Sequence, residues 1–368
     1  MRPISGSLIV TLLAIGCSQQ NPLQPGPASP NVPGPSASRI PDHAAWQSST
    51  PLMSNGASDL CGTTIMADLI LNQSFRCADE GLTVGANNIS VHLNGHTISG
   101  SSSGVGISLT GRSGVRIKGP GIITAFRTGI LVVDSLDIEI DDVSALENGV
   151  PRPPTDALAT LHDGILVINS HRVQLEGNVA SRNGDDGISL VSSSQSELRT
   201  NTSEDNGHNG LRLDASDHNR IRLNRVLSNG DLVGFPRGCG IEVFGSINNV
   251  IEENVVIENH TGIRLRALAV PARASTGNVI QENVVSRSAG PEADRGGIHL
   301  RDSSTRENLI EDNEVTENVH GIALSGGPAR NTFVENTLVG NACGFKGPVD
   351  ENTVGENQFV RNRNDFCS

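Results

Sequence analysis

The sequence has very few aromatic residues. Tyr is absent, Trp occurs once at position 46, and Phe, Tyr and Trp together make up 2% of the chain, whereas Gly occurs 41 times. This composition is typical of short stacked strands joined by tight turns. It argues against deep sugar subsites, in which sugar rings stack on aromatic side chains, and leaves phenylalanines such as Phe235 and Phe244 as candidates for such stacking.

Lysine is almost absent as well. Lys118 and Lys346 are the two lysines among 27 basic residues, and 40 acidic residues give a formal net charge of -13. An acidic surface disfavours nucleic acid and anionic membranes as general partners, so we expect no nucleic-acid partner. Because the chain uses arginine for nearly every positive charge, an arginine alone is not taken as a sign of anion binding.

The hydrophobic run at the N-terminus is too short to cross a bilayer. It extends from Leu8 to Ile15, whereas a spanning helix needs about 20 apolar residues. Residues 1–16 are therefore predicted to be an export signal. Residues 17–49 contain seven prolines among Gly, Ser, Ala and Asn. This composition predicts an extended tether that precedes a folded part over residues 50–368.

The segment LAIGC at 13–17 resembles the lipobox of bacterial lipoproteins, although Ala14 stands where Leu is usual. The resemblance implies that the chain is cut before Cys17 and that its thiol is lipidated. Ser18 in the next position implies passage to the outer membrane or cell surface of the bacterial envelope, with the lipid as the only membrane contact. An ordinary cleaved signal with an incidental Cys is the alternative.

An internal repeat predicts a solenoid. A Gly followed by two aliphatic residues at alternate positions recurs in steps of 22 to 25 residues, with longer steps of 35, 30 and 35 where loops are inserted. Repeats of this length with alternating aliphatics indicate one solenoid coil each. The aliphatic pairs, such as Ile165/Val167, Ile188/Leu190 and Leu211/Leu213, should point inward and stack on each other. The repeat glycines are Gly81, Gly106, Gly129, Gly164, Gly187, Gly210, Gly240, Gly262, Gly297, Gly321 and Gly344.

Asparagines follow the same period. Two of them recur five residues apart in coil after coil, as in Asn178/Asn183, Asn201/Asn206 and Asn224/Asn229. Asn tolerates the left-handed turn conformation, and its amide can bond the same amide in the next coil. We therefore interpret these asparagines as structural ladders.

The repeat, with CGTTI at 61–65 and LNGHTISG at 93–100, resembles bacterial right-handed parallel β-helix proteins of the pectate-lyase-like superfamily over about residues 58–368. The resemblance implies an all-β fold, a single-stranded right-handed parallel β-helix of about 11 coils with an N-terminal cap. The superfamily includes pectin hydrolases, uronate lyases, mannuronan epimerases and a copper-site maturation protein, so the fold leaves the function open.

The cysteines predict two disulfides near the ends of the solenoid. With Cys17 used as an anchor, five cysteines remain, and Cys343 and Cys367 lie 24 residues apart, about one coil. Cys61 and Cys77 form the second expected pair, in the N-terminal cap. Cys239 is left over, and we interpret it as a small buried thiol in preference to a nucleophile or metal ligand.

A polar column precedes the repeat glycines. It contains His162-Asp163, Asp185-Asp186, His208-Asn209 and His260, and successive coils should stack these groups about 4.8 Å apart. Extra residues near 150–161, 230–238, 267–276 and 288–296 should wall a groove along the same strands. Outward positions of these strands carry further ionisable residues, which are Arg212, Asp214, Glu242, Arg264, Arg266, His299 and Arg301.

This column loosely resembles the polygalacturonase-type hydrolases, in which three aspartates, a His and an Arg-x-Lys pair serve acid, base and carboxylate-binding roles. GDDG at 184–187 and GHNG at 207–210 carry the likeness, but GHNG interrupts the family's GHG and Arg266 replaces Lys. The epimerase-type motif with Asp-Pro-His and a Tyr is missing. The candidate catalytic residues are Asp163, Asp185, Asp186 and His208.

Several functions stay open. In a hydrolase Asp163 or Asp186 would protonate the leaving oxygen, and in a lyase or epimerase Arg212 or Arg264 would neutralise a uronate carboxylate while His208 abstracts the C5 proton. His162, Arg212, Asp214, Glu242, Arg264, Arg266 and His299 are the predicted substrate-binding residues. No cofactor is expected to be required, although the paired aspartates are candidate Ca²⁺ ligands and His162 with His208 candidate transition-metal ligands.

We expect a monomeric envelope protein that binds an acidic, possibly uronate-containing polysaccharide along the groove and that cleaves or modifies it if it is an enzyme. The alternative is a non-catalytic structural or adhesion module, in which the aspartates only form turns and the histidines lie on the surface.

Overall fold

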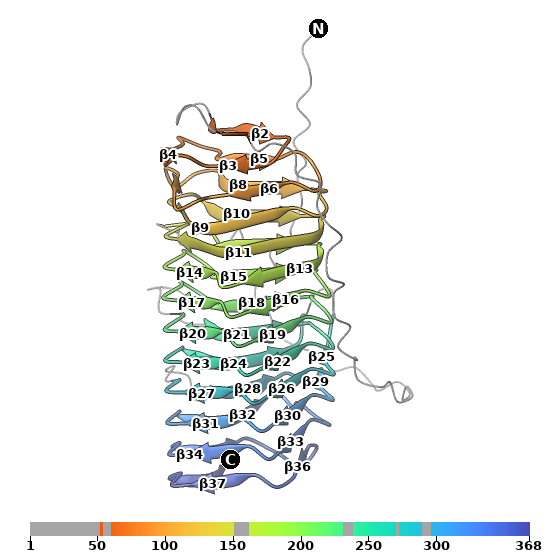
Figure 1. Cartoon of the computed structure of the whole chain (residues 1–368). Helices are drawn as coiled ribbons and strands as arrows, with labels where there is room; N and C mark the ends of the chain where they lie inside the picture. Colours follow the sequence, from red (N-terminus) through yellow and green to blue (C-terminus); the bar gives the residue numbers. More distant parts are fainter. Residues whose placement is uncertain (1–51, 54–59, 151–161, 231–237, 270–271, 289–295) are drawn as a thin grey trace. The chain divides into compact units, whose positions relative to one another are not determined.

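Three short strands build each coil of the folded part. The computed structural model describes residues 52–53, 60–150, 162–230, 238–269, 272–288 and 296–368, and Thr50–Ser368 forms one compact unit. The predicted signal, Cys17, the tether and Phe235 lie outside the described residues. Among those described, no helix is long and apolar enough to cross a membrane. The fold is a right-handed parallel β-helix, as the repeat and the resemblance predicted (Figure 1).

One strand of each coil belongs to a parallel sheet of 13 strands, which we call the repeat-glycine sheet. Its strands are, in order, β2 (Thr63–Ile65), β5 (Leu82–Val84), β8 (Val105–Thr110), β10 (Thr128–Val133), β12 (Ile165–Ile168), β15 (Ile188–Val191), β18 (Leu211–Asp214), β21 (Cys239–Phe244), β24 (Thr261–Arg266), β28 (Ile298–Arg301), β32 (His320–Ser325), β35 (Cys343–Lys346) and β38 (Asn364–Cys367). The repeat predicted eleven of them. The end strands β2 and β38 lack the Gly-aliphatic pattern and were therefore not predicted.

The remaining strands of the coils, two in most coils, belong to a sheet of 23 strands, which we call the ladder sheet. Its strands are β1 (Leu52–Met53), β3 (Leu69–Ile70), β4 (Phe75–Arg76), β6 (Ser90–His92), β7 (Thr97–Ser99), β9 (Arg116–Thr124), β11 (Leu136–Leu146), β13 (His171–Glu176), β14 (Val179–Ser181), β16 (Glu197–Arg199), β17 (Thr202–Glu204), β19 (Arg220–Arg222), β20 (Arg225–Leu227), β22 (Val250–Glu252), β23 (Val255–Ile257), β26 (Val279–Gln281), β27 (Val284–Ser286), β30 (Leu309–Glu311), β31 (Glu314–Thr316), β33 (Thr332–Val334), β34 (Thr337–Val339), β36 (Thr353–Val354) and β37 (Gln358–Val360). A pair of strands, β25 (Ser275–Thr276) and β29 (Thr305–Arg306), forms a third sheet.

The core is the column of aliphatics that the repeat predicted. Ile165 pairs in register with Ile188, and Val167 pairs with Leu190, and all four side chains are fully buried. The repeat glycine is required because its Cα faces this core. A Cβ on Gly187 would lie 2.1 Å from the Ser203 hydroxyl oxygen, so any larger residue there would clash.

The corner asparagines form continuous ladders. The amide oxygen of Asn224 accepts the backbone N–H of Asn201 at 2.9 Å and its side-chain N–H at 3.0 Å. Asn224 in turn donates to the Leu198 carbonyl and to Asn254. Each buried asparagine thus satisfies backbone groups that the turn leaves without a partner, which confirms the structural interpretation.

The predicted disulfides are present. Cys61 pairs with Cys77 and Cys343 pairs with Cys367, whereas Cys239 is a free buried cysteine. Both bonds join neighbouring parts of the chain near the two ends of the solenoid. They restrain the coils that have a neighbour on one side only.

Candidate functional site

A charged ladder runs along the edge where strands β12, β15, β18 and β21 begin. The Asp163 carboxylate accepts the backbone N–H of Asp186 at 3.1 Å, Asp186 accepts that of Asn209 at 2.8 Å, and Asn209 accepts that of Cys239 at 2.9 Å. Asp163 and Asp186 are almost completely buried. The column that the sequence predicted therefore exists, and its aspartates perform the hydrogen bonding of an asparagine ladder.

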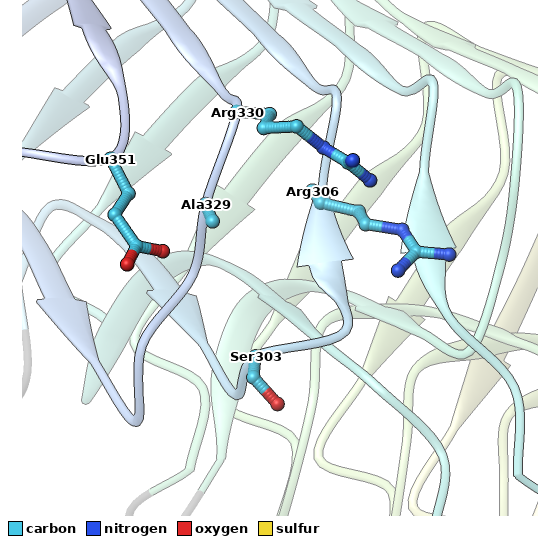
Figure 2. A pocket seen from close by; sticks show the side chains of 5 residues that line it. All are labelled: Ser303, Arg306, Ala329, Arg330 and Glu351. Atoms are coloured by element: carbon cyan, nitrogen blue, oxygen red, sulfur yellow. The ribbon is translucent and has the colours of Figure 1, made fainter. Parts of the chain in front are cut away.

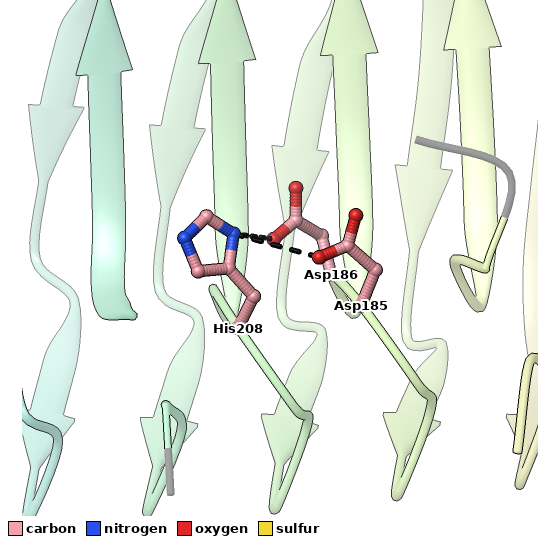
Figure 3. Close-up of side chains that lie close together, drawn as sticks. All are labelled: Asp185, Asp186 and His208. Atoms are coloured by element: carbon pink, nitrogen blue, oxygen red, sulfur yellow. Dashed lines mark hydrogen bonds and ion pairs between the residues drawn. The ribbon is translucent and has the colours of Figure 1, made fainter. Parts of the chain in front are cut away.

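His208 lies on the outside of this ladder and contacts both aspartates of the preceding coil (Figure 3). Its Nδ1 is 3.0 Å from an Asp186 oxygen and 3.6 Å from an Asp185 oxygen. Its side chain is 20% exposed, whereas the aspartate side chains are 2% exposed. An Asp186 carboxylate that accepts from Nδ1–H keeps the proton on that nitrogen and leaves Nε2 free to accept a proton.

The two ladder aspartates have opposite pKa shifts. Burial raises the pKa of Asp163 well above its usual value, and the nearby Asp186 and Asp185 charges raise it further. Burial acts in the same direction on Asp186, but His208, Arg212 and the Asn209 backbone outweigh it and lower the pKa of Asp186 to about 2. At neutral pH Asp186 is therefore ionised, and of the two carboxyl groups Asp163 has the higher pKa.

A second column lies two positions into the same strands. Ser189, Arg212, Glu242, Arg264 and His299 pair in register from β15 to β28. Glu242 is fully buried and accepts Arg264 Nη2 at 2.6 Å and Arg266 Nε at 2.7 Å. Although burial acts to raise the pKa of Glu242, these arginines and Arg212 lower it well below its usual value.

Arg212 and Arg266 are the partly exposed members of this charge network. Arg212 donates to Asp214 at 2.6 Å and lies 3.5 Å from an Asp186 oxygen. Arg266 is 29% exposed, and its guanidinium stacks on the Phe244 ring at 3.8 Å from the centroid. Burial raises the pKa of Asp214, and Arg212 opposes that shift. Arg264 is only 6% exposed, so it holds Glu242 in place and offers little surface to a ligand.

The two remaining predicted residues, His162 and His299, are almost completely buried. His162 is 5% exposed and directly precedes the ladder residue Asp163. His299 is 3% exposed and bonds the Ser325 hydroxyl at 2.9 Å. Most of the inserted segments that were expected to wall a groove lie outside the described residues, so the groove stays a prediction.

Two residues contribute more than the sequence suggested. Ser189 donates to Asp186 at 3.1 Å, and Asn209 donates its side-chain amide both to Asp186 at 2.8 Å and to Glu242 at 3.3 Å. Asn209 thus joins the two columns. Ser189 could have been identified from the sequence by its position in register with Arg212 on the next coil. Only a complete alignment of the coils would reveal that position.

Asp185, Asp186 and His208 are also the described residues best arranged for a cation. One oxygen or nitrogen from each lies within 4.8 Å of the others. Two carboxylates and an imidazole suit a divalent transition metal or Ca²⁺. The competing arrangement is the hydrogen bond between His208 and Asp186, which uses the same atoms.

The comparisons place the chain among β-helix proteins. A family model described as a right-handed beta helix region matches residues 80–246, and one described as a periplasmic copper-binding protein (NosD) matches residues 237–367. A search of curated proteins found no match.

Among solved structures, the Dettilon tailspike protein is similar, with 15% identity and a TM-score of 0.59 over 80% of this chain and 62% of the tailspike. The Agl-KA catalytic domain has 14% identity and a TM-score of 0.51 over 81% of this chain and 62% of that one. The A-module of an Azotobacter vinelandii mannuronan C-5 epimerase has 14% identity and a TM-score of 0.50 over 84% of this chain and 88% of the module. The chain thus spans less than two thirds of the first two, and these likenesses show the fold.

The segment that matches the copper-binding family does not offer a copper site among its described residues. Its one group of three close ligand side chains, Glu311, Asp312 and Glu335, is acidic and partly or fully exposed. Copper prefers imidazole and sulfur ligands, and no Met lies between residues 237 and 367. Among the described residues, the likeness to that family therefore extends to the coils and not to a set of copper ligands.

Proposed function

Because the chain has the right-handed parallel β-helix fold, we propose that it binds an acidic polysaccharide across the repeat-glycine sheet and modifies it with His208 as the base. The observation that carries the proposal is the Asp186–His208 pair beside Arg212, with Arg266 on the same network through Glu242. A base and a carboxylate-binding cation are the two groups that chemistry at the C5 position of a uronate needs. The mannuronan C-5 epimerase module, which has a similar fold, is consistent with a uronate polysaccharide as the ligand.

In the proposed reaction Arg212 and Arg266 bind the uronate carboxylate, which makes the adjacent C5–H more acidic. His208 Nε2 takes that proton while Asp186 stabilises the imidazolium through Nδ1. The electrons of the C5–H bond form the C4–C5 double bond, and the C4–O bond breaks. Asp214, partly exposed and with a raised pKa, donates the proton to the leaving oxygen. In this elimination His208 thus takes up one proton and Asp214 donates one.

Hydrolysis fits the same residues less well. Besides its acid, a glycoside hydrolase needs a second accessible carboxylate that activates water or attacks the sugar. Asp186 is ionised and already accepts hydrogen bonds from His208, Asn209 and Ser189, and Asp163 is fully buried. The geometry therefore favours elimination, or epimerisation when the proton returns to the other face of C5.

The test is incubation of the protein with a panel of uronate polysaccharides, with and without Ca²⁺, while unsaturated-product absorbance and new reducing ends are recorded. The proposal predicts absorbance together with reducing ends. It also predicts that His208→Ala lowers kcat by at least roughly 100-fold, the usual contribution of a general base. His218→Ala is the matched control, because His218 bonds Asn248 on an exposed corner away from the network.

A second candidate, a non-catalytic adhesion module, is favoured by one specific observation. Asp163 and Asp186 are buried and hydrogen-bond the backbone of the next coil, which is a structural task. Polymer binding that is weakened by Arg266→Ala, without turnover on any substrate, would support this candidate and overturn the enzymatic one.

We also propose that the protein is a lipoprotein of the bacterial envelope, anchored through Cys17. The support is the lipobox-like segment at 13–17. Mass spectrometry of the mature N-terminus should find a diacylated Cys17, and Cys17→Ser should move the protein from the membrane fraction to the soluble fraction. An unmodified N-terminus at another residue would contradict the anchor.

A further inference from the structure

A basic pocket lies where the chain turns from the repeat-glycine sheet towards the ladder sheet. It encloses about 370 Å³ and is lined by Ser303, Arg306, Ala329, Arg330 and Glu351 (Figure 2). That volume is at the lower end for small-molecule sites and suits one sugar residue better than a larger ligand. In Figure 2 the side chains of Arg306 and Arg330 extend in the same direction, and Glu351 lies apart from them.

Two like charges approach each other in this pocket. Arg306 pairs with Ala329 across the coils, so Arg330 follows directly on the neighbouring coil. Arg330 Nη2 binds Glu307 at 2.7 Å, whereas Arg306 has no ion pair among the described residues. Both arginines are exposed. Of the arginines that line this pocket, one is therefore available for an anion, and the second can share it through its remaining N–H groups.

The pocket lies beyond the ends of the strands that carry Arg266 and Arg301. Arg266 pairs in register with Arg301, and Ser303 is two residues beyond Arg301. Three coil steps separate β18, next to His208, from β28, which corresponds to roughly 14 Å along the solenoid at the spacing of neighbouring strands. A polymer that binds at His208 can therefore reach the pocket, whereas a single sugar residue cannot occupy both.

We propose that Arg306 and Arg330 form an outlying subsite that binds the anionic group of one sugar residue, a carboxylate or a sulfate ester. Glu351 and Ser303 accept or donate the hydrogen bonds of its hydroxyl groups. This inference rests on the proposed function, because the same polysaccharide occupies His208 and the subsite. The subsite makes affinity depend on the length of the oligosaccharide.

The test is calorimetric titration of the whole protein with a length series of oligouronates, the corresponding sulfated oligosaccharides and neutral oligosaccharides. Removing one charge-assisted contact costs roughly tenfold in affinity. The double variant Arg306→Ala/Arg330→Ala should therefore bind long anionic oligomers at least roughly tenfold more weakly and short oligomers unchanged. Arg199→Ala/Arg222→Ala is the matched control, because it removes the same charge from the ladder sheet.

The outcomes separate the two proposals. Equal affinity of the wild type and the pocket variant for every long anionic oligomer overturns the subsite, and His208-dependent turnover would still stand. Binding that falls in the pocket variant but not in Arg266→Ala, together with turnover that does not depend on His208, supports the subsite and overturns the proposed function. Comparison of the titrations with oligouronates and with sulfated oligosaccharides shows which anionic group the subsite prefers.

Discussion

Two columns of side chains perform the same hydrogen bonding in this solenoid, and one of them is charged. Asn201 and Asn224 accept backbone N–H groups of the preceding coil with neutral amides, and the column continues through both halves of the protein. Asp163 and Asp186 accept the backbone N–H groups of the following coil with carboxyl groups, over two coils. Because a buried amide performs this task without the cost of burying a charge, the carboxyl groups are where a function beyond stability is expected.

The largest effect should come from the centre of the charge network. Glu242→Ala leaves Arg264 buried without its carboxylate partner, and breaking a buried ion pair costs about 3–5 kcal/mol. We expect the free energy of unfolding to fall by that amount in urea titrations followed by circular dichroism. An unchanged unfolding midpoint would contradict the buried network.

The second-largest loss of stability should come from a substitution in the neutral ladder of asparagines. Asn224→Ala removes the acceptor of two Asn201 N–H groups and the donor to the Leu198 carbonyl. Unsatisfied buried groups cost about 1–3 kcal/mol each, so we expect a loss of roughly 3 kcal/mol in the same titration. Asn357→Ala is the control, because Asn357 is partly exposed in the last coil and should lose less.

Asp186 should make the charged ladder sensitive to acid. Its pKa is about 2 in the folded protein and about 4 in the unfolded chain. Its contribution to stability is therefore present above about pH 4 and is lost as the pH falls towards 2. Asp186→Asn keeps the ladder acceptor, so its stability should fall less than that of the wild type between pH 5 and 2. If the stability of the variant and that of the wild type fell equally over this pH range, the lowered pKa of Asp186 would be contradicted.

Asp163 should behave in the opposite way. Its raised pKa means that its contribution is present below about pH 4 and is lost as the pH rises through the folded value. Asp163→Asn supplies the same acceptor without a titratable group. We therefore expect the variant to be more stable than the wild type at pH 7, and the gain to disappear below pH 4. A destabilised variant at pH 7 would show that the carboxyl is needed in its charged form.

The smallest effect should come from the exposed corner pairs. Arg287 binds Glu258 at 2.9 Å, but both side chains are about half exposed, and such pairs contribute less than about 1 kcal/mol. Glu258→Ala should shift the free energy of unfolding by no more than roughly 0.5 kcal/mol. It is the matched control for Glu242→Ala, since the two variants differ in burial and not in chemistry.

The sequence by itself determined the solenoid, its inward aliphatic pairs, its asparagine ladders and the two disulfides. Each follows from a period of one coil, because stacking places identical positions next to each other whatever the side chains are. The same period predicted that Asp163, Asp186 and His208 would lie on successive coils. It missed strands β2 and β38, because their coils do not carry the repeat pattern.

Only the tertiary structure decided which of these side chains are buried and what each one binds. The period does not state that Asp186 turns towards His208, that Glu242 is enclosed by arginines, or that Arg264 is hidden while Arg266 stacks on Phe244. It also does not bring Arg306 beside Arg330, because that pocket forms where two coils turn. These features depend on side-chain rotamers and on the neighbours that exclude water, which are properties of packing and not of periodicity.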